Sequence, residues 1–201
     1  MIESSAVVSP RRFSNVERWG PMSQALHWFI VALILAMAVL GLTMTDLPNS
    51  PFKIRLYNLH KSIGLTILVL VALRVFWRAW AGTPKIIATI PRWQHRLAEG
   101  THVALYALLF ALPITGWLMN SYAGFPLKWF GFFAVPSLAA RDNDLHELFE
   151  DVHEWLFWAL VLLALGHACA AIYHHLFQRD ATLARMLPRG WLRAPDPQES
   201  P

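Results

Sequence analysis

Two histidines lie at the edge of and within a long apolar stretch near the C-terminal end of the chain. His153 and His167 are fourteen residues apart, and the run 155–178 contains no Asp, Glu, Lys or Arg. That run is long enough to cross a bilayer as one helix. On such a helix the two imidazoles lie within about 40° of one face and about 21 Å apart along the axis. This separation excludes one shared metal ion and favours two separate sites near opposite sides of a membrane.

Four apolar runs are available to position these side chains. We expect membrane spans at about 22–45, 56–80, 102–121 and 153–177. They form one transmembrane domain, 19–178, between polar tails at 1–18 and 179–201. The chain is 56% hydrophobic and 15% charged, with a mean hydropathy of +0.39, which is too apolar for an ordinary soluble domain. The first twenty residues lack the apolar stretch and cleavage site of a signal peptide. The sequence therefore predicts an all-α integral membrane four-helix bundle.

The positive charges divide unevenly between the two ends of this bundle. Twelve lie on the side of both termini: Arg11, Arg12, Arg18, Arg74, Arg78, Lys85, Arg92, Arg96, Arg179, Arg185, Arg189 and Arg193. Five lie on the other side: Lys53, Arg55, Lys61, Lys128 and Arg141. This asymmetry predicts cytoplasmic termini in a bacterial inner membrane. Because the cations are spread over segment ends, they indicate membrane orientation and not a nucleic-acid partner. The stretch 126–140 is expected to lie at the membrane interface.

This topology sorts the histidines into two layers. His60 and His153 begin their spans on the outer side, whereas His27 and His167 meet on the inner side. The fourteen-residue step also joins His27 to Gly41, His60 to Arg74 and His102 to Gly116. We define the outer layer as His60, His153, Gly41 and Gly116, and the inner layer as His27, His102, His167 and Arg74. The glycines would let a flat porphyrin approach the backbone or would serve as helix-packing notches, and the arginine would meet an anion such as a haem propionate.

Haem explains paired histidines better than zinc does. Structural zinc needs four converging ligands and catalytic zinc three, whereas each pair offers two. Two imidazoles on opposite sides of a plane match six-coordinate haem iron. The single cysteine, Cys169, excludes an intramolecular disulfide, and no C-x-x-C-H motif is present for covalent attachment.

Local patterns then resemble the bacterial cytochrome b561 family. They include Leu26-His27-Trp28, His60-Lys61-Ser62-Ile63-Gly64, Pro113-Ile114-Thr115-Gly116-Trp117, the run HACAAIYHH from His167 and RDATLARMLP from Arg179. The resemblance covers about 18–189. It implies a four-helix cytochrome with two haem b groups, ligated by His27 with His167 and by His60 with His153. It also implies electron exchange with ubiquinone, and one member of the family is described as a superoxide oxidase.

Three functions remain open at this point. The first is a ubiquinone-linked oxidoreductase with superoxide as a candidate donor; the second is an electron-relay subunit that needs a partner redox protein; the third is a non-haem transporter. The cations Lys53, Arg55 and Lys61 would attract superoxide or are ordinary loop residues.

Some histidine roles stay open as well. His102 would contact a propionate or quinone, or replace an inner ligand. His146 and His174 would relay protons to a quinone or are surface residues at helix ends. No pattern locates the quinone pocket.

Overall fold

Four long helices dominate the computed structural model, which describes residues 18–84 and 91–192. They are α1 (Pro21–Met44), α2 (Pro51–Ala81), α3 (Arg92–Ala123) and α4 (Asn143–Leu176). The strands β1 (Leu127–Trp129) and β2 (Phe133–Val135) lie between α3 and α4, and a short 3-10 helix, η1 (Ala184–Met186), follows α4. Four of the cations counted for orientation, Arg11, Arg12, Lys85 and Arg193, lie outside the described residues.

Each helix is long and apolar enough to cross a membrane, in agreement with the four predicted spans. Three of them nevertheless begin before the predicted apolar run, α2 at Pro51, α3 at Arg92 and α4 at Asn143. Polar residues set two of these starts, since Ser50 accepts a hydrogen bond from the Lys53 amide and Asp142 accepts one from the Leu145 amide. Hydropathy identifies the apolar part of a helix that lies in lipid, whereas N-cap residues determine where the helix begins.

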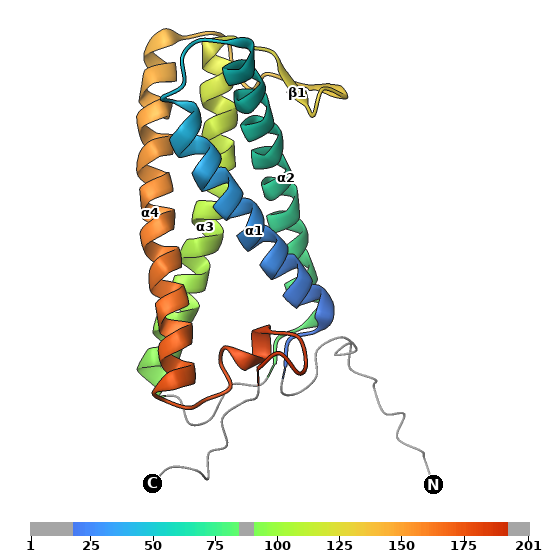
Figure 1. Cartoon of the computed structure of the whole chain (residues 1–201), viewed down its shortest axis with the longest axis vertical. Helices are drawn as coiled ribbons and strands as arrows, with labels where there is room; N and C mark the ends of the chain where they lie inside the picture. The colour runs from blue at the N-terminus through green and yellow to red at the C-terminus, as the bar shows by residue number, and fades with distance from the viewer. Residues whose placement is uncertain (1–17, 85–90, 193–201) are drawn as a thin grey trace, which may run out of the picture.

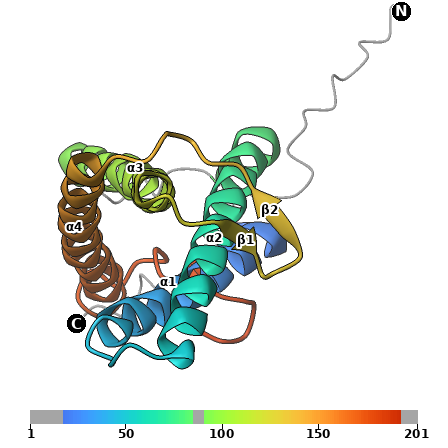
Figure 2. The ribbon, with the colours of Figure 1, turned by 90° about the horizontal axis from the view of Figure 1, so that it is seen from above.

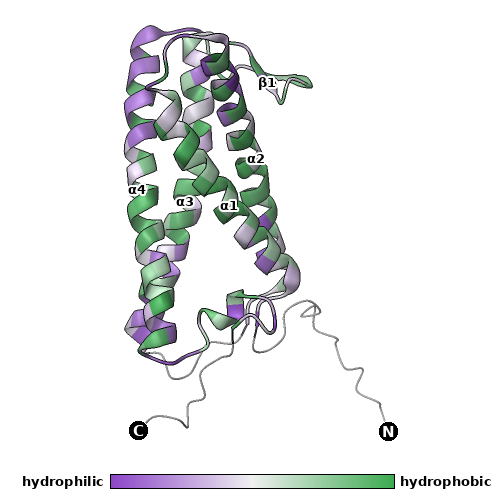
Figure 3. Cartoon of the chain, in the orientation of Figure 1, coloured by the Kyte–Doolittle hydropathy of each residue, from purple (hydrophilic) through white to green (hydrophobic). Residues whose placement is uncertain are grey.

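The bundle consists of two antiparallel helix pairs, α1 with α2 and α3 with α4, which meet mainly through α2 and α3. Figure 2 shows α4 on the left, α3 at the top, α2 on the right and α1 along the lower edge. The small core joins Ile30, Ile67 and Val71, while large apolar side chains such as Leu35, Val69 and Leu162 are exposed. Figure 3 shows hydrophobic residues along the middle of the helices and hydrophilic residues on the upper part of α4. This outward-facing apolar surface is what a lipid-embedded bundle requires.

A short antiparallel hairpin, β1 with β2, extends sideways from the upper end of the bundle (Figure 1). The sequence predicted an interfacial segment here but no strands. Two side chains of α2 fix the hairpin: Ser62 Oγ accepts a hydrogen bond from the Phe130 amide at 2.9 Å, and the Trp129 indole donates to Thr66 Oγ1 at 3.1 Å. The exposed aromatic rings of Phe132 and Phe133 continue the apolar surface outward.

The segment after α4 turns back beneath the start of α1, at the lower end of Figure 1. Three side chains near the start of α1 donate hydrogen bonds to its carbonyls: Arg18 to Ala184, Gln24 to Arg185 and Leu187, and Trp28 to Met186. The reversal uses Arg179 in the left-handed region, with φ of 50°. The two ends of the described chain are therefore tied together at the lower end of the bundle.

Candidate functional site

The outer layer surrounds a cavity of about 610 Å³ at the upper end of the bundle. His60, His153, Gly41 and Gly116 all line it. Each residue comes from a different helix, because Gly41 lies on α1, His60 on α2, Gly116 on α3 and His153 on α4. Residues that are far apart in the sequence thus converge on one cavity within the usual size range of ligand pockets.

The two outer imidazoles lie at a separation suited to one metal ion between them. Their ring centroids are 6.3 Å apart and their planes are inclined by 67°. Two imidazoles bound on opposite sides of one metal have centroids about 6 Å apart, given a metal–nitrogen distance near 2 Å. Among residues 18–84 and 91–192, no three His, Cys, Asp or Glu side chains gather closely enough to hold a metal ion. Two imidazoles therefore suit a metal ion whose remaining ligands belong to a cofactor.

The outer-layer glycines make room for the histidine rings. A Cβ at Gly41 would lie 3.4 Å from His60 Cε1, and one at Gly116 would lie 3.1 Å from His153 Cε1. The sequence left these glycines as positions of porphyrin approach or as helix-packing notches. In the structure each glycine lies against the imidazole of the neighbouring antiparallel helix.

The hydrogen bonds behind the two outer imidazoles differ. Thr115 Oγ1 donates to the Leu112 carbonyl at 2.9 Å and lies 3.1 Å from His153 Nδ1. Because the hydroxyl proton is already used, Nδ1 of His153 donates to Thr115, and Nε2 keeps the free lone pair. The buried Nδ1 of His60 has no hydrogen-bond partner in the described structure. The hydrogen bond to Thr115 thus fixes the orientation of the His153 ring, whereas packing holds the His60 ring.

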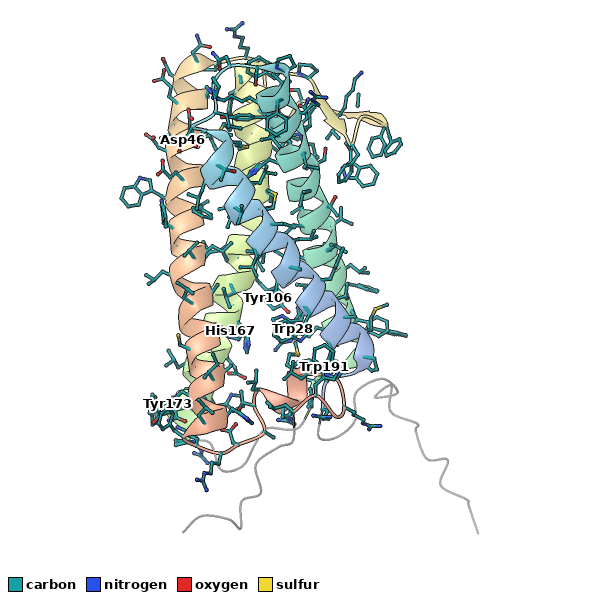
Figure 4. The ribbon with its side chains drawn as sticks, in the orientation of Figure 1. Trp28, Asp46, Tyr106, His167, Tyr173 and Trp191 are labelled. Carbon is teal, nitrogen blue, oxygen red and sulfur yellow. The ribbon has the colours of Figure 1, made fainter. Side chains whose placement is uncertain are left out.

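The inner layer also draws one residue from each helix. The ring centroids of His102 and His167 are 5.2 Å apart, while the His27 ring packs against Trp28 at 5.2 Å. His27 still lies within electrostatic range of His102, His167 and Arg74. Figure 4 shows His167, Tyr106 and Trp28 at similar heights in the lower half of the bundle. The structure therefore places His102, and not His27, in ring contact with His167.

Arg74, the arginine of the inner layer, donates hydrogen bonds to two other helices. Arg74 Nε donates to the Tyr106 hydroxyl at 3.0 Å, and its Nη1 donates to the Ser23 carbonyl at 3.1 Å. These contacts join α2 to α3 and α1. The guanidinium carries five donors in a fixed plane, so further N–H groups remain for a carboxylate.

Two cations at the outer end donate hydrogen bonds within the protein. The Lys53 ammonium donates to the Thr45 and Leu47 carbonyls, which follow the end of α1. Lys61 lines the outer cavity and donates to Asn120 Oδ1 at 2.9 Å. Glu150 and Glu154 line the same cavity, so its charges are mixed. This pattern favours the ordinary structural explanation for Lys53.

Comparison with known proteins shows which family the chain belongs to. The family model for prokaryotic cytochrome b561 matches residues 18–189. The chain belongs to this family. Cytochrome b561 homolog 2 of Escherichia coli is 35% identical over 87% of the chain and 94% of its own length. Cytochrome b561 homolog 1 of the same organism is 29% identical over 87% of the chain and 99% of its length. Probable superoxide oxidase CybB of Yersinia pestis is 26% identical over 86% of the chain and 97% of its length.

Membership of the cytochrome b561 family implies haem b in a multi-pass membrane protein with four spans. The outer cavity fits that group, since two facing imidazoles and an apolar lining are present. Sequence reasoning missed Thr115, Tyr106 and Asn120 because a neutral polar residue in a helix carries no distinctive pattern. The fourteen-residue step could have directed attention to Thr115, because it precedes Gly116 in the outer layer.

Proposed function

We propose that this cytochrome b561 carries two haem b groups and transfers electrons between ubiquinone and a small donor, with superoxide as the candidate donor. Bound haem supplies reversible one-electron transfer. His60 and His153 would hold the outer group, and His27 and His167 the inner one. Arg74 would bind a propionate while Tyr106 and Ser23 keep its guanidinium in place.

One observation carries the proposal: the ring centroids of His60 and His153 are 6.3 Å apart in a cavity that both outer-layer glycines also line. Two layers on antiparallel helices suit a protein that moves electrons along its long axis. The basic residues near both termini favour a cytoplasmic inner end and a periplasmic outer end. Superoxide as donor is supported by the name of the Yersinia relative, and Lys61 is the cation in the outer cavity that an anion would meet.

Ligand substitutions test the pairing. His60→Ala and His153→Ala are expected to remove the same haem, and His27→Ala and His167→Ala the other, as measured by haem content and reduced-minus-oxidised spectra in detergent. His102→Ala is expected to keep both. Loss of one common haem from His60→Ala and His167→Ala would contradict the pairing. Loss of the inner haem from His102→Ala, with retention in His27→Ala, would reassign the inner ligand to α3.

Separate donors test the activity. The purified protein is expected to contain two haems per chain, reducible by superoxide and, independently, by ubiquinol. Superoxide dismutase must abolish the first reaction and leave the second unchanged. Reduction by ubiquinol or a co-purifying dehydrogenase alone would favour the electron-relay function. A chain that binds no haem would favour the transporter.

A further inference from the structure

The outer cavity has an apolar lower part and a polar upper end. Ile34, Leu109 and Leu160 line it near the middle of their helices, whereas its polar lining residues come from the helix ends at the outer side. These polar residues include Thr45, Tyr57, Lys61, Asn120, His146 and Glu150. Haem b has the same division, with an apolar macrocycle and two carboxylates, the propionates, on one edge. The two ends of the cavity therefore differ in the way that orients such a cofactor.

Lys61 is the cation that lines this cavity, and it lacks an anionic partner. Its ammonium donates to Asn120 Oδ1 at 2.9 Å. Within residues 18–84 and 91–192 the ammonium forms no ion pair with a carboxylate. A half-buried ammonium beside an apolar lining is costly unless an anion compensates its charge. Because lysine has three N–H donors and Asn120 accepts from one, two remain for a ligand.

The contact with Asn120 determines where the ammonium lies. Asn120 is four residues beyond Gly116 on α3, about 6 Å nearer the outer surface. It is 7% exposed, and its side-chain nitrogen donates to the Phe125 carbonyl at 2.9 Å. That hydrogen bond leaves the side-chain oxygen to accept from Lys61. The ammonium is therefore held at the polar end of the cavity, one helical turn beyond the outer layer.

We propose that Lys61 binds a propionate of the outer haem, so that this haem points its carboxylate edge toward the outer surface. The inference rests on the proposed di-haem function. A carboxylate at this position accepts hydrogen bonds from the two free N–H groups and supplies the missing negative charge. Glu150 and Glu154 line the same cavity and would repel a carboxylate in the absence of Lys61. The lysine thus determines which way the edge of the haem points.

Three substitutions separate this ion pair from a general effect of charge. Lys61→Met removes the charge and keeps the length of the side chain. Lys61→Arg keeps the charge and can bind a carboxylate through two N–H groups. Lys128→Met is the matched control, because Lys128 is exposed at the same end of the bundle and does not line the cavity.

The experiment uses the purified holoprotein in detergent. An optical redox titration measures the midpoint potential of the outer haem, and resonance Raman spectra of the propionate bending modes report hydrogen bonds to the carboxylates. His153→Ala, which is expected to lack the outer haem, assigns the signals. Loss of a positive charge disfavours the ferrous form. We therefore expect Lys61→Met to lower the outer potential by about 60 mV, a tenfold change in the relative stability of the two oxidation states, and to shift one propionate mode. Lys61→Arg should restore the potential, and Lys128→Met should change neither signal.

Other outcomes overturn the inference in distinguishable ways. If Lys61→Met changes neither the outer potential nor a propionate mode, Lys61 does not bind the haem, and slower reduction by superoxide would then assign it to the diffusing anion. An equal shift of potential in Lys128→Met would indicate a general field at the outer end. If Lys61→Met lacks the outer haem, occupancy regained in Lys61→Arg and not in Lys61→Gln supports the ion pair, and any other pattern excludes it. A wild type without a second haem would reject the proposed function itself.

Discussion

At the scale of single residues, the two outer imidazoles have unequal support. Thr115 accepts a hydrogen bond from His153 Nδ1, whereas His60 Nδ1 is buried without a partner in the described structure. A hydrogen bond to the distal nitrogen of a metal-bound imidazole orients the ring and makes it a stronger donor. We therefore expect His153 to be the better-oriented ligand and His60 the more easily displaced one.

Substituting Thr115 tests this asymmetry. Thr115→Val keeps the shape of the side chain but removes the acceptor for His153 Nδ1. The weaker imidazole donor stabilises ferric iron less, so we expect the midpoint potential of the outer haem to rise by about 60 mV, equivalent to a tenfold change in relative affinity. A redox titration followed optically measures it. An unchanged outer potential, or a shift in the inner haem alone, would show that Thr115 does not act through His153.

The two glycines provide a matched pair of substitutions. A Cβ at Gly116 would lie 3.1 Å from His153, and one at Gly41 would lie 3.4 Å from His60. We expect Gly116→Ala to displace the His153 ring and to lower the occupancy of the outer haem strongly. Gly41→Ala should lower that occupancy less. Haem-to-protein ratios and the reduced spectrum measure both. The reverse order of effects would indicate that contact with the porphyrin, and not with the imidazole, limits these positions.

At the scale of helices and turns, the outer layer was the easiest part to predict from the sequence. Fourteen residues return close to the same helix face, so helix periodicity together with the four-span topology was enough to group His60, His153, Gly41 and Gly116. The inner pairing was less certain because His27, His102 and His167 share one depth, and depth alone does not select a partner. The contact between His174 and Asp180 could not be predicted, since it depends on the reversal at Arg179, where φ is positive.

A lysine ammonium lies beside the carbonyls that follow the end of α1. Lys53 donates to the Thr45 and Leu47 carbonyls, where a positive charge is favourable next to the helix C-terminus. We expect Lys53→Gln to lower stability by about 1 kcal/mol in thermal unfolding in detergent, without changing the rate of haem reduction by superoxide. Arg55→Gln, at an exposed neighbouring position, is the control. A slower superoxide reaction in Lys53→Gln alone would instead support electrostatic steering.

At the scale of the whole molecule, the helices share few buried apolar contacts. Four helices expose most of their apolar surface, and the buried core is small. Water cannot drive these helices together within lipid, so close packing and polar contacts must do so. Side chains from all four helices line the outer cavity, and a ligand that binds there would join both helix pairs.

Removing haem should therefore destabilise the bundle as a whole. A ligand that binds only the folded state stabilises it in proportion to the logarithm of its concentration over its dissociation constant, giving about 4 kcal/mol at a thousandfold excess. We expect the apoprotein to unfold at a clearly lower temperature than the holoprotein and to recover when haem is added back. The His60→Ala variant should lie between the two. Equal unfolding temperatures for apoprotein and holoprotein would show that the bundle is stable without its cofactor.

The two helix pairs meet mainly through α2 and α3, and this arrangement has a consequence for biosynthesis. Each pair can enter the membrane as a separate insertion unit, leaving its histidines on a face that is still open. We expect capture of haem to be the last step of assembly, because His60 and His153 come from different helix pairs. A cell short of haem would accumulate open chains, which are natural substrates for membrane quality-control proteases. The abundance of this cytochrome in the cell would then follow the supply of haem, even with transcription held constant.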